Sequence, residues 1–201
     1  MSVLLALHSS SPALGVGVLD LDQPDQPSVV EAFDLGRGLA NGLLDCIEQL
    51  LPAERWPQIA RLAVATGPGG FTGTRLTVVL ARTLAQQLHC PLDGVSSFAL
   101  IAERARIACP TWLLQPLPRR GVVAGLYGPS PDEPPWVLEQ QAPRLYASVD
   151  ALPAGPRLEA QVHLIDDVQL LLGRCAAQAA AGAPAPWQPV LPHYPTSPVD
   201  R

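Results

Sequence analysis

The residues with the clearest chemical potential form a glycine-rich run, ATGPGGFTGTR, from Ala65 to Arg75. An apolar segment that predicts a buried strand precedes it, and a segment with helical periodicity follows. Glycines permit positive φ angles and close backbone approach, and the amides at a helix N-terminus favour anions. One interpretation is a phosphate-binding nest in which Thr72 caps the helix; the other is a tight turn without a ligand. The nest would consist of Gly67, Gly69, Gly70, Thr72, Gly73 and Arg75.

Two common phosphate-binding motifs are missing from this run. It has no GxxxxGK[ST] sequence, so it is not a P-loop, and GxGxxG does not occur at this turn. The chain contains no lysine, and all 13 of its basic residues are arginine. This composition excludes a P-loop lysine, a Schiff-base lysine and a lysine general base.

The remaining side chains form no recognisable catalytic or metal-binding arrangement. The four cysteines are far apart and form no CxxC pair, which favours reduced thiols over structural zinc or a redox motif. The acid pair Asp166 and Asp167 is better explained by helix capping than by metal binding, with Asp166 as the N-cap. The serines at 9–11 lack the GxSxG context of a nucleophile, and His163 is expected in a strand.

Composition and charge restrict the class of protein further. Of 201 residues, 48% are hydrophobic and 15% are charged, so a sizeable folded core is expected. A chain with a formal charge of −5 gains little binding free energy from counterion release on nucleic acid. Any RNA should therefore be held by another subunit. No apolar run is long enough to suggest a membrane span. The apolar N-terminus has no preceding basic residues, so we interpret it as a strand and not as a signal peptide.

The first hundred residues predict a β-β-β-α-β-α order. Alternating or β-branched apolar runs indicate strands at 3–7, 14–19, Val29–Phe33, 62–66 and Leu92–Val95. Helical spacing of apolar residues indicates helices at 39–51 and 73–88. This order is that of the repeat unit of the ribonuclease-H-like fold found in actin-like and sugar-kinase-like proteins, and it is an analogy at the level of the fold.

The second half is richer in proline and predicts a reduced copy of the same unit. We expect strands at 112–114, 122–127, 136–139 and 162–165, a helix at 167–181, and an extended tail at 182–201. The fold class is therefore α/β, actin-like, with two βββαβα lobes of which the second is reduced. The predicted domains are an N-terminal lobe at 1–100 and a proline-rich C-terminal lobe at 101–201.

The two first-half helices are candidates for a partner interface. The second is apolar around much of its circumference, so one face is expected on the sheet and another is available for a neighbouring helix. Burial of both faces within the monomer is the alternative. The interface residues would be Leu39, Leu43, Ile47, Leu76, Leu80 and Leu84.

The sequence resembles the TsaB family, also called YeaZ. The run GPGGFTGTR is similar to the family signature GPGSFTGxR, with Gly70 in place of serine. The segments LLALHSSS, LDGVSSF and GVVAGLY, which begin at Leu4, Leu92 and Gly121, resemble other family segments in the same order. The likeness covers residues 1 to about 100 well and the second half poorly.

The resemblance implies a function as well as a fold. It implies a cytoplasmic, non-catalytic subunit of the machinery that makes N6-threonylcarbamoyladenosine in tRNA, without membrane attachment. Its partners would be TsaD, a paralogue that carries the metal and the transferase site and contacts the first-half helices, and TsaE, an ATPase. A homodimer in isolation, contact with tRNA only through the complex, and a nucleotide at the subunit interface are further expectations. No cofactor should be bound stably by this chain.

Several positions depart from the family pattern. His8 stands where the family has aspartate, and a histidine serves a hard cation poorly, which argues against independent ATP hydrolysis. The segment RGLANGLL, from Arg37, replaces a HSExLL helix start. QPLPRR, from Gln115, replaces a DAR motif, leaving Arg119 or Arg120 for its arginine. Two alternatives stay open, a small actin-like ATPase or kinase and a glycoprotease-like peptidase.

Overall fold

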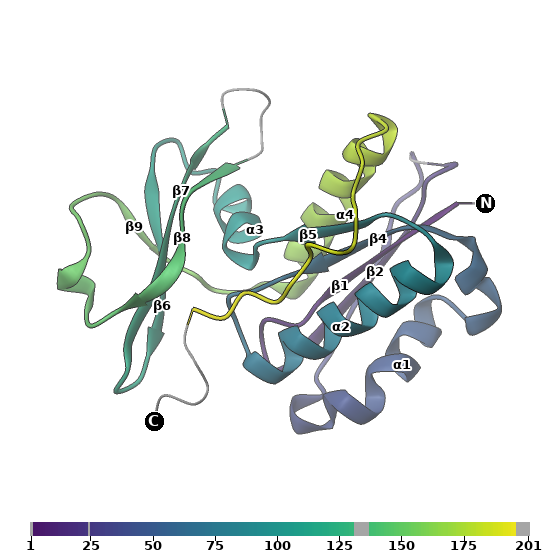
Figure 1. Cartoon of the computed structure of the whole chain (residues 1–201), viewed down its shortest axis with the longest axis horizontal. Helices are drawn as coiled ribbons and strands as arrows, with labels where there is room; N and C mark the ends of the chain where they lie inside the picture. The colour runs from purple at the N-terminus through teal and green to yellow at the C-terminus, as the bar shows by residue number, and fades with distance from the viewer. Residues whose placement is uncertain (1, 24, 131–136, 196–201) are drawn as a thin grey trace.

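The computed structural model describes residues 2–23, 25–130 and 137–195, which form two β-sheets with helices (Figure 1). The first sheet has the order β3-β2-β1-β4-β5 and the second the order β8-β7-β6-β9. This arrangement confirms the predicted mixed α/β class. In the described residues, no helix has the length and apolar character needed to cross a lipid bilayer.

The first sheet combines an antiparallel meander with two parallel strands. Its strands are β1 (Val3–His8), β2 (Leu14–Asp20), β3 (Val29–Phe33), β4 (Ile59–Ala65) and β5 (Leu92–Val95). β1, β2 and β3 pair antiparallel, whereas β1, β4 and β5 run parallel. Parallel neighbours need a crossover, and α1 (Leu39–Leu50) and α2 (Phe71–Leu88) provide the two crossovers.

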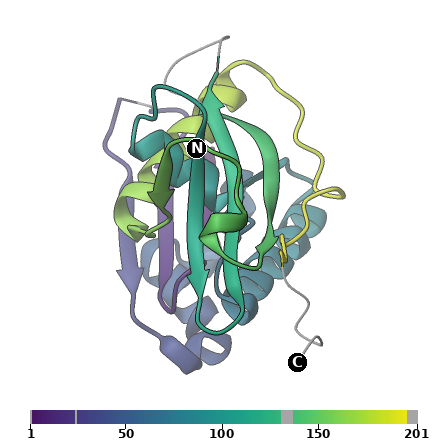
Figure 2. The ribbon, with the colours of Figure 1, turned by 90° about the vertical axis from the view of Figure 1, so that its left-hand side faces the viewer.

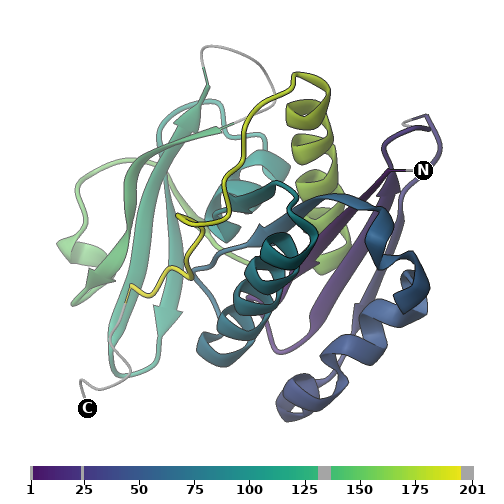
Figure 3. The same ribbon diagram turned by 45° about the vertical axis from the view of Figure 1, so that its right-hand side comes forward.

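Alternation along β1 divides the core between the two faces of this sheet. Val3, Leu5 and Leu7 face α1 and α2, while Leu4 and Ala6 face the opposite side. That side is covered by α3 (Ser97–Arg104) and by α4 (Leu164–Ala180), as Figure 3 shows. The helix α4 therefore packs on the first sheet although it comes from the second half of the chain. The predicted domain boundary near residue 100 lies within α3.

The second sheet is a shorter version of the first. It contains β6 (Thr111–Leu117), β7 (Gly121–Pro129), β8 (Val137–Tyr146) and β9 (Arg157–Glu159). β6, β7 and β8 form a meander, and β9 pairs parallel with β6 (Figure 2). Between β8 and β9 there is only a short 3₁₀ turn, Val149–Ala151, where the first sheet has the helix α1. This missing crossover helix is what reduces the second unit.

Most predicted elements of the first half are confirmed, with shifted ends. β4 begins at Ile59, three residues before the predicted start, and α2 begins at Phe71 instead of Gly73. Gly70 is therefore the N-cap of α2, and the prediction that Thr72 caps it is wrong. A sequence pattern places helix ends within only a few residues, because the first turn need not carry apolar side chains.

The largest errors of the sequence-based prediction concern α3 and the start of α4. Ser96 is the N-cap of α3, a helix that the sequence analysis did not predict, and the predicted strand at 162–165 leads into α4. His163 is the N-cap residue of α4 instead of a strand residue, and its amide donates to Asp167 Oδ2 at 2.8 Å. Asp166 is consequently not the cap. Of the strand predicted at 136–139, Trp136 lies outside the described residues, as do residues 196–201 of the tail.

Candidate functional site

The glycine turn between β4 and α2 packs directly onto the segment that follows β1. A Cβ added to Gly69 would lie 2.3–2.5 Å from three Ser10 atoms, and one added to Gly73 would lie 2.6 Å from Ser9 Oγ. The Gly70 amide donates a hydrogen bond of 2.9 Å to the Ser10 carbonyl. These glycines are therefore required for backbone contact between two turns, a role that side chains would block.

This packing uses part of the predicted phosphate nest. The Gly70 amide is already bonded to Ser10, and the carbonyl of Gly67 accepts from the Ser97 amide at 2.8 Å. Gly67 has a φ of +94°, which explains why glycine occupies that position. The turn thus serves an intramolecular contact, and a phosphate site would have to rest on the residues that begin α2.

The residues that begin α2 line an open hollow of about 550 Å³. The lining combines both halves of the chain, since it includes Gln115 of β6 as well as the segment Ser10–Pro12 that follows β1. Arg37 lines it, whereas Arg75 does not and is exposed on α2. Of the predicted nest, Gly70, Thr72 and Gly73 reach the hollow. The cation available to an anion there is the Arg37 guanidinium, which the sequence analysis did not select.

Hydroxyl groups connect the two sheets behind the hollow. Ser10 Oγ and Ser97 Oγ lie 2.6 Å apart, and Ser96 Oγ lies 2.9 Å from the Tyr127 hydroxyl. That hydroxyl donates to Glu139 Oε2 at 2.7 Å. Burial is the main cause that raises the pKa of Tyr127, so this phenol stays protonated. The hydroxyls of Ser10, Ser96 and Ser97 are thus engaged by one another, by tyrosine and by backbone, in contacts that hold the sheets together.

His8 is fully buried at the end of β1. Burial, followed by the nearby Arg104 charge, lowers its pKa to about 4, so the imidazole is neutral. Its Nδ1 lies 3.4 Å from the Ser10 amide nitrogen and accepts its hydrogen bond, which fixes the proton on Nε2. A buried neutral imidazole has no access to a substrate in solvent. Among the described residues, no group of three or more His, Cys, Asp or Glu side chains is arranged to hold a metal ion.

The predicted interface helices are more buried than the sequence suggested. The side chains of Leu39, Leu43, Ile47 and Leu84 lie in the core and are not available to a partner. Leu76 and Leu80 are half-buried and pack against the same core. The predicted leucine rows instead identify the faces with which α1 and α2 meet the sheet and each other. Large apolar side chains are exposed at other positions, Leu44 of α1 at 46% and Val79 of α2 at 51%.

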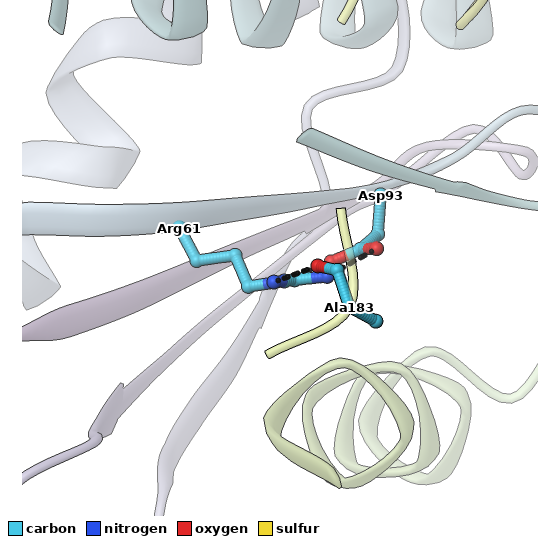
Figure 4. A network of polar contacts seen from close by, with 3 residues as sticks. All are labelled: Arg61, Asp93 and Ala183. Carbon is cyan, nitrogen blue, oxygen red and sulfur yellow. Dashed lines mark hydrogen bonds and ion pairs between the residues drawn. The ribbon is translucent and has the colours of Figure 1, made fainter. Parts of the chain in front are cut away.

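A buried ion pair was not identified from the sequence. Arg61 of β4 binds Asp93 of β5 with two hydrogen bonds of 2.6 and 3.0 Å, and a third Arg61 bond reaches the Ala183 carbonyl at 3.1 Å (Figure 4). Both residues lie within strands that otherwise read as apolar. A charged side chain inside a buried strand needs an oppositely charged partner. The presence of one such residue in each of two apolar strands could therefore have predicted this ion pair.

Comparison with known proteins shows which proteins this chain resembles. The family model described as "TsaD: tRNA N6-adenosine threonylcarbamoyltransferase" matches residues 36–117, which are less than half of the chain. A TsaB protein from Bacillus subtilis (strain 168), named for tRNA threonylcarbamoyladenosine biosynthesis, is 33% identical over 131 residues. One from Buchnera aphidicola is 36% identical over 44 residues. The chain is thus similar to TsaB proteins, also called YeaZ, over part of its length.

Solved structures support the fold across the whole chain. YeaZ from Pseudomonas aeruginosa has a TM-score of 0.71 and 23% identity, covering 96% of this chain and 100% of that one. An uncharacterized protein "with similarity to peptidase YEAZ" from Pseudomonas aeruginosa has a TM-score of 0.74 and 22% identity, covering 98% and 100%. The sequence match to the Bacillus subtilis protein covers 62% of this chain and about half, 54%, of that protein. The Buchnera match covers 22% of this chain and 21% of its relative.

Proposed function

We propose that this protein is a non-catalytic subunit of the machinery that places threonylcarbamoyl groups on tRNA adenosine. In this proposal it binds and activates a TsaD-type transferase in the cytoplasm. A TsaE-type ATPase joins the complex, and tRNA is contacted only through the other subunits. The similarity to TsaB proteins supports the pathway, and the net charge of −5 supports the indirect contact with tRNA.

The observation that carries the proposal is the pair of exposed apolar side chains on α1 and α2. Leu44 and Val79 are about half exposed, although both helices already bury other faces in the core. Exposed leucine and valine on adjacent helices are suited to a helical partner. Asp45 and Glu48 of α1 are exposed, and α2 carries the exposed Arg75, the part-buried Arg82 and no acid. A TsaD-type helix pair, or a second copy of this chain in isolation, would be oriented by these charges.

The non-catalytic part of the proposal is supported by how the polar groups are engaged. Ser10 and Ser97 contact each other, and the buried His8 ring accepts from a backbone amide instead of a serine hydroxyl. Neither arrangement supplies the nucleophile and base of a peptidase. A nucleotide contributed at the subunit interface could occupy the hollow at the start of α2. This chain alone should show no magnesium-dependent nucleotide turnover.

The test measures binding of the full chain to the TsaD-type subunit of the same organism. Val79→Asp and Leu44→Asp place a charge on the proposed surface, and Leu138→Asp is the control at a comparably exposed position on β8. We expect each helix variant to weaken binding at least about tenfold, with the control unchanged and all three folded by circular dichroism. Wild-type affinity in both helix variants, or nucleotide turnover by the isolated chain, would refute the proposal.

A further inference from the structure

The tail that follows α4 is held in place along its length. We call residues 183–195 the C-terminal strap. Figure 1 shows it in yellow, running from α4 past β5 towards β8. The Leu92 amide of β5 donates to the Ala185 carbonyl at 2.9 Å, and Val190 is buried against Gly94. The strap thus covers the open edge of the first sheet, an edge that proteins commonly protect.

The middle of the strap is hydrogen-bonded to α2 through the Arg82 side chain. The Arg82 guanidinium donates to the carbonyls of Gln188 and Val190 and lies 5.3 Å from the centre of the Trp187 ring. A guanidinium has several donors in a fixed plane, so it can hold two strap carbonyls at once. The strap is therefore anchored to the helix that the proposed function assigns to a partner.

The end of the strap spans the two sheets at one residue. The His193 amide donates to the Thr66 carbonyl at 2.7 Å, directly before the glycine turn. His193 Nε2 lies 2.8 Å from the Pro143 carbonyl of β8. Because a carbonyl only accepts, the ring must carry its proton on Nε2 in this contact. The next residue, Tyr194, packs against Phe71 with ring centres 4.6 Å apart and ring planes tilted by 39°, and Phe71 lines the hollow at the start of α2.

The geometry points to a conformational role for the strap: it is an inter-sheet clasp that holds β8 against the glycine turn through His193 and places Tyr194 on Phe71 beside the hollow. The basis is that His193 bonds both sheets while Arg82 holds the preceding residues on α2. Release of His193 frees β8 and the glycine turn together, whereas α1 and its packing on the first sheet are unaffected. The inference does not require the proposed partner.

Hydrogen–deuterium exchange of the full chain tests this role. We expect His193→Ala to raise exchange about three- to tenfold in peptides covering 66–74 and 137–146, the effect of losing one net hydrogen bond. Peptides from α1 should be unchanged. His193→Gln, which can still donate to Pro143, should restore much of the protection. His163→Ala is the matched control, because this exposed histidine lies away from the strap.

A second variant, Arg82→Met, acts at a distance from both peptides. It should raise exchange in the strap itself and also at 66–74 and 137–146, because the strap is one coupled unit. The inference is overturned if His193→Ala leaves both peptides at wild-type rates, or if exchange rises uniformly and includes α1. It is also overturned if Arg82→Met frees the strap while both peptides keep their protection.

Discussion

The Arg61–Asp93 ion pair offers the sharpest test of how this fold is held together. The two side chains are 5% and 7% exposed and share two hydrogen bonds, so the pair is bidentate and almost dry. The bond to Asp93 is the main cause that raises the pKa of Arg61. The perturbation is Asp93→Asn, which keeps the shape of the side chain and removes its charge.

The expected magnitude follows from the burial of the cation that remains. An asparagine leaves Arg61 buried without a countercharge, and breaking such a pair from one side costs about 3–5 kcal/mol. Domains have about 5–15 kcal/mol of stability in total, so this is a large fraction. If the Arg61 guanidinium moves, its hydrogen bond to the Ala183 carbonyl, where the C-terminal strap begins, should also weaken. The variant should therefore loosen the strap as well as β5.

The assay is urea unfolding followed by circular dichroism and tryptophan fluorescence, with the slope of the transition checked for constancy. Arg61→Met and the double variant complete a thermodynamic cycle. We expect the double variant to be less destabilised than the sum of the single variants, since it removes both charges. Glu48→Gln on the exposed side of α1 is the control, with a change within about 0.5 kcal/mol.

Two outcomes would refute the reasoning. A loss below about 1 kcal/mol for Asp93→Asn would mean that the buried cation finds other solvation, contrary to the burial of both partners. Strict additivity in the cycle would mean that the two side chains do not stabilise each other across the strands. Either result would mean that apolar contacts, and not the ion pair, hold β5 in the sheet.

Two further predictions concern the end of β1 and the glycine turn. Burial lowers the pKa of His8 to about 4, so between about pH 6.5 and 4 the unfolded chain binds a proton that the folded chain does not. The free energy of unfolding should therefore fall by about 3 kcal/mol as the pH drops through that window. Urea unfolding of His8→Asn at several pH values should lack this dependence. Gly69→Ala should lower the melting temperature by several degrees, about 1–3 kcal/mol, because its Cβ would strike Ser10, whereas Gly70→Ala, with its nearest neighbours at 3.8 Å, should melt like the wild type. A pH-independent His8→Asn difference, or equal melting of the two alanine variants, would contradict these assignments.

The first-half elements could be predicted because their signals are local. Residues 29–33 and 92–95 have the predicted strand bounds, since β-branched and apolar runs bounded by turn residues are typical of strands. The glycine turn was recognisable because three glycines separate a buried strand from an amphipathic helix and a fourth lies in the first turn of that helix. Predicting this turn and its position required only the order of residues along the chain.

The errors came from signals that depend on neighbours far away in sequence. The leucines of α1 and α2 have the same periodicity whether they face a partner or a sheet, and only packing shows that Leu43, Ile47 and Leu84 are internal. Short apolar segments such as 162–165 fit a strand or a helix start equally well. The capping contact between His163 and Asp167 decided that case.

The sequence by itself determined the order of the elements, the glycine turn and the likeness to TsaB, because each depends on residues close together in the chain. Only the tertiary structure decided which faces stay exposed, where His8 sits, and that Arg61 meets Asp93. It also decided that His193 contacts both Thr66 and Pro143. The physical reason is that burial and hydrogen bonding are properties of pairs, and the partners here lie from 32 to more than 120 positions apart.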